Sequence, residues 1–201
     1  MTLISDKASN YSAKFRAFNY QKIAYEAIRD LEYAGIFHEQ GLGKTKIAID
    51  LALYWLSNSI VDSLIIVAKK GLIANWKREI SLHTNLTPKV LTQDRNANFF
   101  LFNSPTRVYL SHYEAVFSEE SRISLFLSTR RVGIILDESH KIKNPLSRIS
   151  KTFHRLSTGF SKRVIMTGTP IANRPYDIWS QIFFLDQGDS LGTDFDVFKS
   201  D

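Results

Sequence analysis

Residues 38–45 read His-Glu-Gln-Gly-Leu-Gly-Lys-Thr, and this stretch decides the fold class of the chain. A short apolar run precedes it at residues 35–37, and an apolar pattern of helical period follows over residues 44–57. Gly41 and Gly43 let backbone N–H groups surround a polyphosphate without interference from a Cβ atom. The following helix points its positive N-terminus at the same anion. The stretch therefore predicts a phosphate-binding loop between a strand and a helix. The alternative is a glycine-rich turn that caps an ordinary helix.

The lysine and threonine that end the loop supply its chemistry. Lys44 can bridge the β- and γ-phosphates of a nucleotide, and the Thr45 hydroxyl can coordinate Mg²⁺. Leu42 separates the two glycines, and we expect residues 41–45 as a unit to bind the nucleotide. The strict pattern of such loops begins with glycine, whereas this chain has His38 at that position.

A second apolar run, residues 134–136, ends in Asp137 and Glu138. This pattern is typical of a buried parallel strand, and ligands of open α/β sheets bind at the carboxyl ends of such strands. Asp137 would hold Mg²⁺ as the partner of Thr45, and Glu138 would polarise the attacking water. Acids also end strands simply as solvated residues, but the phosphate loop upstream favours a role in nucleotide hydrolysis.

A third apolar run, residues 164–166, is followed by Thr-Gly-Thr-Pro. Read together, the three segments resemble motifs I, II and III of superfamily-two helicases, in the form found in Swi/Snf-like double-stranded-DNA translocases. Residues 39–45 resemble that family's Glu-Met-Gly-Leu-Gly-Lys-Thr. Residues 137–144 resemble its Asp-Glu-Ala-His-Arg-Ile-Lys-Asn, and residues 167–173 resemble its Thr-Gly-Thr-Pro-Leu-Gln-Asn.

The resemblance covers nearly the whole chain, from about residue 11 to about residue 198. Residues 18–21, Phe-Asn-Tyr-Gln, resemble the entry motif whose glutamine reads adenine, here Gln21. Ser139 stands where the family pattern has alanine, and Ala68 stands where it usually has proline. Neither departure touches the Lys-Thr pair or the Asp-Glu pair.

The resemblance implies that the second and third motifs communicate. His140 would hydrogen-bond across to the third motif, and it would couple the state of the nucleotide to Thr167, Gly168 and Thr169.

The resemblance also implies a fold, cofactors and a domain division. We expect an α/β fold, a RecA-like P-loop NTPase three-layer sandwich with a central, mainly parallel sheet, and ATP and Mg²⁺ as cofactors. Residues 1–13 would be an N-terminal lead-in, and residues 14–201 would be the helicase ATP-binding domain, the first RecA-like lobe. The family needs a second RecA-like lobe, which supplies arginine fingers. This lobe is absent from the chain, so we expect the missing C-terminal part or another chain to provide it.

The hydrophobic pattern by itself predicts alternating strands and helices, and hence a parallel sheet with right-handed crossovers. Helices are expected over residues 21–33, 44–57, 73–81, 119–128, 147–156 and 176–185, and strands over residues 35–37, 64–68, 89–91, 108–110, 132–136 and 163–166.

Composition excludes several classes of protein. The chain has no cysteine, which rules out disulfides, thiolate catalysis and cysteine–zinc sites. No apolar run is long enough to span a membrane, and the first residues lack the apolar region of a secretory signal. We expect an intracellular protein with no membrane partner, cytoplasmic or, in a eukaryote, nuclear.

The net charge of +6 is unevenly distributed. Residues 139–176 contain eight Lys or Arg residues and no Asp or Glu. The resemblance places DNA-tracking surface in this segment, so we expect Lys141 and Lys143 to contact phosphates of double-stranded DNA. Lys69 and Lys70 are a second pair of candidates for the same contacts. The alternative is a solvated helix face that happens to be basic.

Trp76 is expected to be structural, and three histidines are expected to be structural or exposed. We expect Trp76 to pack in the core rather than to stack on bases. His83, His112 and His154 lack the spacing of metal ligands.

Three functions remain open from the sequence. We expect the ATP-binding lobe of a Swi/Snf-like DNA-dependent ATPase, an ATP hydrolase that is weak or inactive without the second lobe. The alternatives are a lone nucleotide- or DNA-binding module with little turnover, and the motor lobe of a restriction-type or other helicase. RNA helicases of the DEAD type would show Asp-Glu-Ala-Asp and Ser-Ala-Thr, and this chain shows neither.

Overall fold

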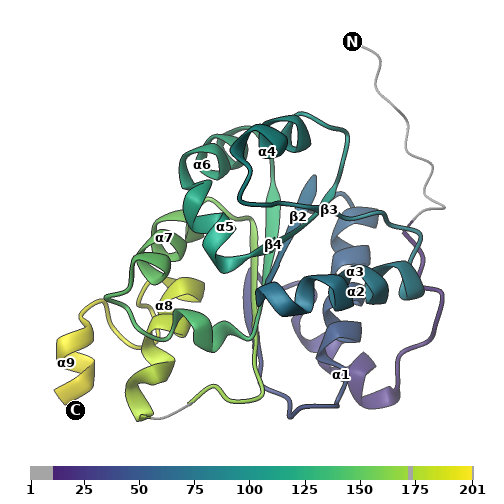
Figure 1. The fold of residues 1–201 in the computed structure, drawn as a ribbon. Coiled ribbons are helices and arrows are strands. Elements are labelled where there is room, and N and C mark those ends of the chain that lie inside the picture. The colour runs from purple at the N-terminus through teal and green to yellow at the C-terminus, as the bar shows by residue number, and fades with distance from the viewer. Residues whose placement is uncertain (1–10, 172–173, 201) are drawn as a thin grey trace.

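A six-stranded parallel sheet forms the centre of the computed structural model, which describes residues 11–171 and 174–200 (Figure 1). The strands lie in the order β1-β6-β5-β2-β4-β3, and every pair is parallel. The residues of β2, β4 and β5 are buried throughout, as expected for a parallel sheet covered on both faces. The strands are β1 (Tyr33–Ile36), β2 (Ser63–Ala68), β3 (Lys89–Val90), β4 (Val108–His112), β5 (Val132–Asp137) and β6 (Lys162–Met166).

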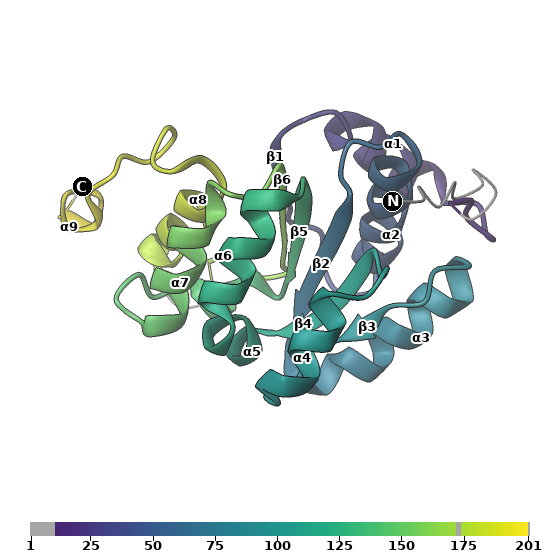
Figure 2. The ribbon, with the colours of Figure 1, turned by 90° about the horizontal axis from the view of Figure 1, so that it is seen from above.

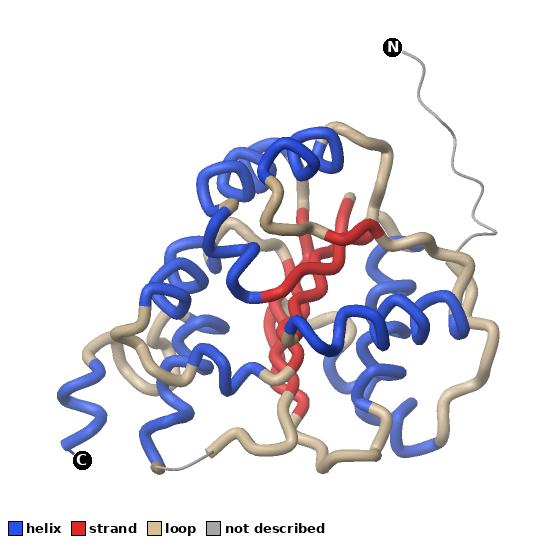
Figure 3. The backbone as a smooth tube through the Cα atoms, viewed as in Figure 1, coloured by secondary structure: helices blue, strands red, loops and turns tan. Residues whose placement is uncertain are grey.

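Helices cover both faces of this sheet and create two apolar cores (Figures 2 and 3). Trp55 and Trp76 belong to the core beneath the first group of helices, and Phe153 and Phe184 belong to the core beneath the second. This three-layer α/β arrangement confirms the predicted fold class. The first group is α1 (Asn19–Ile28), α2 (Lys44–Ser57) and α3 (Ile73–His83); the second is α4 (Arg95–Phe102), α5 (Tyr113–Ser118), α6 (Glu120–Thr129), α7 (Arg148–Ser157) and α8 (Trp179–Asp186), beyond which lies α9 (Phe195–Ser200).

The carboxyl ends of the strands meet at one edge of the sheet, because all the strands run in the same direction. β1 leads into the glycine-rich loop, β5 ends at Asp137, and β6 leads into the Thr-Gly-Thr-Pro segment. Met166 lies opposite Ile36 on one neighbouring strand and opposite Asp137 on the other. The strand order therefore brings the three sequence motifs to adjacent positions.

The first helix and strand differ from the sequence prediction. α1 ends at Ile28, and β1 already begins at Tyr33, where the pattern predicted continued helix. Tyr33 lies opposite Arg163 of β6, and the indole of Trp55 donates a hydrogen bond to the carbonyl of Arg29 at 2.9 Å. These tertiary contacts override the local helical preference of residues 29–33.

Three short helices, α4, α5 and α9, were missed by the sequence prediction. The Asp94 carboxylate caps α4 by accepting hydrogen bonds from the backbone of Asn96 at 2.9 Å and of Ala97 at 3.2 Å. The ring of Phe102, at the other end of α4, packs against Tyr109 and Phe126. Helices this short depend on caps and packing rather than on their own sequence pattern, so periodicity does not reveal them.

The helix predicted over residues 176–185 is divided in the structure into a 3₁₀ turn (Pro175–Ile178) and α8.

Candidate nucleotide-binding site

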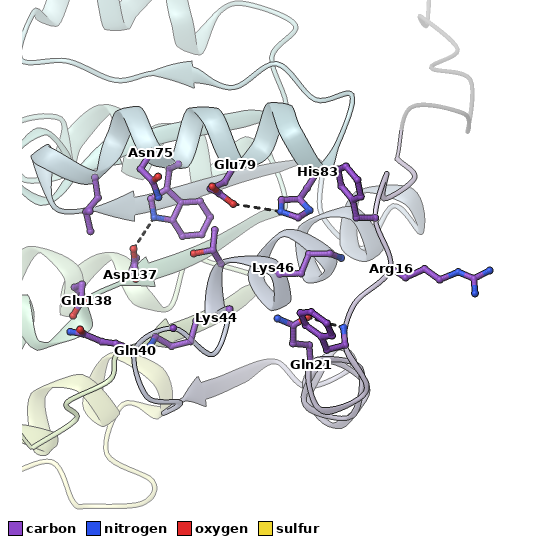
Figure 4. A pocket seen from close by; sticks show the side chains of 17 residues that line it. Arg16, Gln21, Gln40, Lys44, Lys46, Asn75, Glu79, His83, Asp137 and Glu138 are labelled. Carbon is purple, nitrogen blue, oxygen red and sulfur yellow. Dashed lines mark hydrogen bonds and ion pairs between the residues drawn. The ribbon is translucent and has the colours of Figure 1, made fainter.

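A cavity of about 590 Å³ opens at the carboxyl edge of the sheet (Figure 4). Side chains of α1 and of the glycine-rich loop lie on one side of it, and side chains of α3 lie on the other. Leu42, which the sequence grouped with the loop, does not line the cavity and is 40% exposed. The residues that line it include Gln21, Gln40, Gly41, Gly43, Lys44, Thr45, Asn75, Trp76, Glu79, His83, Asp137 and Glu138.

The backbone of the loop requires its two glycines for different reasons. Gly41 and Gly43 both have positive φ angles, +84° and +67°, which side chains with a Cβ rarely adopt. A Cβ atom on Gly41 would meet open space, so only the conformation demands glycine there. A Cβ atom on Gly43 would collide with the amide nitrogen of Gln21. The buried Gln21 side chain, whose Oε1 accepts a hydrogen bond from Phe18 N at 2.9 Å, therefore lies directly against the loop.

Lys44 and Thr45 form the first turn of α2, at the mouth of the cavity. The Lys44 ammonium donates hydrogen bonds to the carbonyls of His38 at 2.7 Å and Glu39 at 3.0 Å. It is thereby held inside the curve of the loop, beside the backbone groups expected to receive phosphate. The N-terminus of a 14-residue helix lies at the same point and favours an anion there.

Asp137 is a buried carboxylate at the end of β5, with 9% of its surface exposed. The Trp76 indole donates a hydrogen bond to its Oδ2 atom at 2.8 Å, and the Tyr113 hydroxyl donates one to its backbone carbonyl at 2.7 Å. Burial raises the pKa of Asp137 above its usual value, while the bond from Trp76 acts in the opposite direction. The carboxylate is thus fixed in orientation and faces the cavity that holds Lys44.

Glu138 follows with an unusual backbone, because its φ of 54° and ψ of 51° lie in the left-handed region. Its side chain lines the cavity, and its Oε2 atom lies 3.2 Å from His140 Nδ1. Burial lowers the pKa of His140, and the positive charge of Lys69 lowers it further. His140 Nδ1 also lies 3.5 Å from the Thr167 hydroxyl, at the outer limit of a hydrogen bond. The expected contact between the second and third motifs is therefore present, but it is long.

The third segment lies against the phosphate loop. A Cβ atom on Gly168 would approach the backbone nitrogen of Gln40 to 3.5 Å and the carbonyl of His38 to 3.6 Å. The Thr167 hydroxyl accepts a hydrogen bond from Thr169 N at 3.1 Å, which shapes the turn. The fold thus assembles all three motifs around one edge of the sheet.

The donors at the site fit magnesium held jointly with phosphate. Among residues 11–171 and 174–200 there is no group of three or more His, Cys, Asp or Glu side chains that could hold a metal alone. Thr45 and Asp137 supply a hydroxyl and a carboxylate, which are the oxygen ligands that Mg²⁺ prefers. Mg²⁺ is commonly held by one or two such groups together with substrate phosphates.

The basic residues expected to contact DNA differ in their surroundings. Lys70 and Lys141 are exposed, and Lys69 is partly buried. The Lys143 ammonium forms an ion pair with Asp177 at 3.0 Å, so part of its charge is already balanced within the protein.

Three further cations of the acid-free segment are bound in structural contacts. Arg163 is buried, and its guanidinium donates to the carbonyls of Ser157, Phe160 and Leu185. Arg155 forms an ion pair with Glu120. Lys162 donates to the carbonyls of Asp30 and Leu31. The sequence suggested that the cations of residues 139–176 form one basic surface. The structure shows instead that several of them are bound within the protein.

Trp76 is the site residue whose role the sequence missed. It is 1% exposed, which confirms the expected place in the core, but its indole also positions Asp137. A buried indole N–H needs an acceptor, and this requirement was the only signal in the sequence. Glu79 and His83 also line the cavity, one and two helical turns along α3 from Asn75.

Comparison with known proteins agrees with this geometry. The family model "SNF2-related domain" matches residues 20–200. The chain is 31% identical over 160 residues to a probable ATP-dependent DNA helicase of Arabidopsis thaliana, covering 73% of this chain and 14% of that protein. It is 33% identical over 154 residues to a probable chromatin-remodeling complex ATPase chain of Oryza sativa, again 73% of this chain and 14% of the relative.

A solved structure shares the fold. It is described as the Sulfolobus solfataricus SWI2/SNF2 ATPase core in complex with dsDNA, and it aligns with a TM-score of 0.77 at 24% identity. The alignment covers 95% of this chain and 40% of that one. Among the described residues, each helix is too short or too polar to span a lipid bilayer. The chain spans 12% to 16% of the length of the curated relatives it matches. The family match over residues 20–200 identifies the chain as a member of the SNF2-related domain family.

Proposed function

We propose that this chain is the ATP-binding lobe of a translocase that couples ATP hydrolysis to movement on double-stranded DNA. One observation carries the proposal: Lys44, Thr45, Asp137 and Glu138 line a single cavity, although the chain separates them into two distant motifs. A lysine and a hydroxyl at a helix N-terminus, facing two acids, match the requirements of nucleotide triphosphate hydrolysis.

Each group has a distinct task in this proposal. The backbone of residues 41–45 and the Lys44 ammonium bind the β- and γ-phosphates. Gln21, which lines the same cavity, would contact the base. Thr45 and Asp137 would hold a magnesium ion, which would supply positive charge to neutralise the charge that develops on the phosphates. Glu138 accepts a proton from the attacking water, and its partner His140 keeps the carboxylate oriented toward the cavity.

DNA and a second lobe are the proposed partners. Lys69 and Lys70 directly follow β2, and Lys141 lies in the turn that follows β5. These lysines would contact backbone phosphates of the duplex. A second RecA-like lobe would close the cavity and supply an arginine. Such an arginine is worth about 10³–10⁵ in rate in comparable phosphoryl transfers, so we expect this chain alone to turn over slowly.

Calorimetric titration of the chain with Mg-ATP tests the nucleotide assignment. Lys44→Ala removes a charged hydrogen-bond donor worth about 1.5–3 kcal/mol, and should weaken binding by about ten-fold or more. The matched control is Lys89→Ala, which removes an exposed lysine from β3, on the outermost strand of the sheet. Equal affinity of Lys44→Ala and the unaltered chain would refute the assignment.

A lone binding module is the second candidate, and turnover separates the two. A chain that binds Mg-ATP but shows no hydrolysis, even when joined to a second lobe, would support the binding module instead.

A further inference from the structure

The strained backbone of Glu138 is held from both sides by buried hydrogen bonds. Its left-handed conformation costs free energy in a residue with a Cβ, and it persists only where the surroundings enforce it. On the preceding side, the Tyr113 hydroxyl donates to the carbonyl of Asp137 at 2.7 Å. On the following side, the Ser139 hydroxyl donates to Oε1 of Gln181 at 2.7 Å. Both hydrogen bonds thus flank Glu138 in the chain, and neither Tyr113 nor Ser139 lines the cavity.

Gln181 uses its whole amide to join separate parts of the molecule. It lies in α8 and has no exposed surface. Its Nε2 group donates to the carbonyl of Pro170 at 2.8 Å and to the carbonyl of Asp177 at 3.0 Å. The same side chain thus accepts a bond from the acidic motif and donates one to the Thr-Gly-Thr-Pro loop.

Ser139 is the residue that makes this link possible. It is fully buried, and it replaces the alanine of the family pattern that the acidic motif resembles. A methyl group at this position would leave Gln181 Oε1 buried and without the Ser139 donor, which is an unfavourable state for a polar atom. The departure from alanine is therefore matched by a partner 42 positions away.

We propose that Gln181 is a positioning residue that ties the backbone at Glu138, through Ser139, to the loop of residues 167–170. The two segments then keep a fixed relative position, which adds a second connection to the long contact between His140 and Thr167. The consequence for catalysis rests on the proposed function, whereas the mechanical link does not.

Hydrogen exchange of the chain, without nucleotide, tests the link. Gln181→Met removes both arms at similar volume, and Ser139→Ala removes only the arm to the acidic motif. Both should speed exchange of the Gly168 and Thr169 amides, by about five-fold for the removal of one hydrogen bond. Ser139→Ala should add nothing further in the Gln181→Met background, because its effect passes through Gln181.

Ser150→Ala is the matched control. Ser150 is also buried, and its hydroxyl donates to the carbonyl of Ile142 at 3.1 Å without any bond to Gln181. This variant should lose stability but leave exchange at Gly168 and Thr169 unchanged. The link is refuted if Gln181→Met leaves that exchange unchanged, or if Ser139→Ala acts equally in both backgrounds.

Steady-state ATP hydrolysis by the same variants, each joined to a second lobe, tests the positioning role. Ser139→Ala and Gln181→Met should lower kcat by about five-fold, with KM for ATP unchanged, because the phosphate contacts of residues 41–45 do not involve them. Faster exchange with an unchanged kcat would overturn the positioning role. Absence of hydrolysis in the unaltered chain joined to a second lobe would instead refute the proposed function, and the exchange experiment would still decide the link.

Discussion

Asp137 and Trp76 form a buried hydrogen bond at the candidate site. Both residues are nearly inaccessible to solvent, and they join β5 to α3 across 61 positions of the sequence. Partners that orient a metal-binding carboxylate are usually as necessary as the ligand itself. A residue that serves the core can therefore also orient the carboxylate that, in the proposed function, would hold magnesium.

Trp76→Phe removes the indole donor and leaves a smaller aromatic ring in the core. We expect a loss of about 1.5–3 kcal/mol in the free energy of unfolding, the usual value for a hydrogen bond to a charged group. Mg-ATP affinity should fall by about ten-fold or more, because Asp137 loses its orienting partner. Denaturant unfolding and calorimetry measure the two effects.

Trp55→Phe is the control for this experiment. Trp55 is fully buried and donates to the carbonyl of Arg29, but it does not line the cavity. Loss of the Trp55 indole should lower the free energy of unfolding and leave Mg-ATP affinity unchanged. Unchanged Mg-ATP affinity in both variants would show that the indole of Trp76 does not orient Asp137.

Glu138→Gln separates binding from chemistry. The amide keeps the size of the side chain but cannot accept a proton, so hydrolysis should fall by about 10²–10⁴ while ATP remains bound. We would compare ATP affinity and turnover in a protein that also contains a second lobe. Glu114→Gln, an exposed neighbour of His112, should change neither quantity. Turnover equal to that of the unaltered protein would remove Glu138 from its role as base.

At the scale of elements, α7 and α8 meet around a histidine. His154 of α7 lies 3.0 Å from the carbonyl of Ser180 in α8 and packs against the rings of Phe183 and Trp179. Burial lowers the pKa of His154, and the charge of Arg155 lowers it further, while the bond to Ser180 opposes this shift. The neutral ring is therefore the form that fits between these two helices.

The sign of the pH dependence follows from this lowered pKa. In the unfolded chain His154 binds a proton near its ordinary pKa of about 6.5, whereas in the folded chain it does so only at lower pH. The free energy of unfolding should therefore decrease as the pH falls through about 6.5 toward the lower pKa of His154 in the folded chain. Thermal melts between about pH 7.5 and 5.5 should show a smaller decrease for His154→Phe. A slope equal to that of the unaltered protein would mean that His154 does not contribute.

At the scale of the whole molecule, the proposed binding of DNA depends on exposed lysines. A translocase must tolerate every sequence, so under the proposed function these lysines should contact phosphates rather than base edges. Lys70 and Lys141 are the exposed candidates, whereas Lys143 is paired with Asp177. We therefore expect the first two to dominate DNA binding.

Reversing Lys70 and Lys141 to Glu should weaken DNA binding equally for unrelated duplexes. The slope of log affinity against log salt should also become less steep, by about one for each phosphate that the protein no longer neutralises. Fluorescence anisotropy with two unrelated duplexes over a salt series measures both effects. Lys89→Glu, on the outermost strand, should leave the slope unchanged. If the double reversal also leaves it unchanged, the DNA site lies elsewhere.

The sequence by itself determined the fold class, the alternation of strands and helices, and the positions of Lys44, Thr45, Asp137 and Glu138. These features depend on local spacing, which is recorded directly in the order of residues. It did not determine the short helices, whose stability comes from caps and packing.

Only the tertiary structure decided which distant residues became partners. Trp76 donates a hydrogen bond to Asp137, and Ser139 donates one to Gln181. Arg155 pairs with Glu120, which lies outside the acid-free segment of residues 139–176. Each pairing depends on strand order and helix packing, which bring together groups far apart in the chain. Local periodicity carries no record of such contacts, because it specifies which face a residue occupies and not what lies opposite that face.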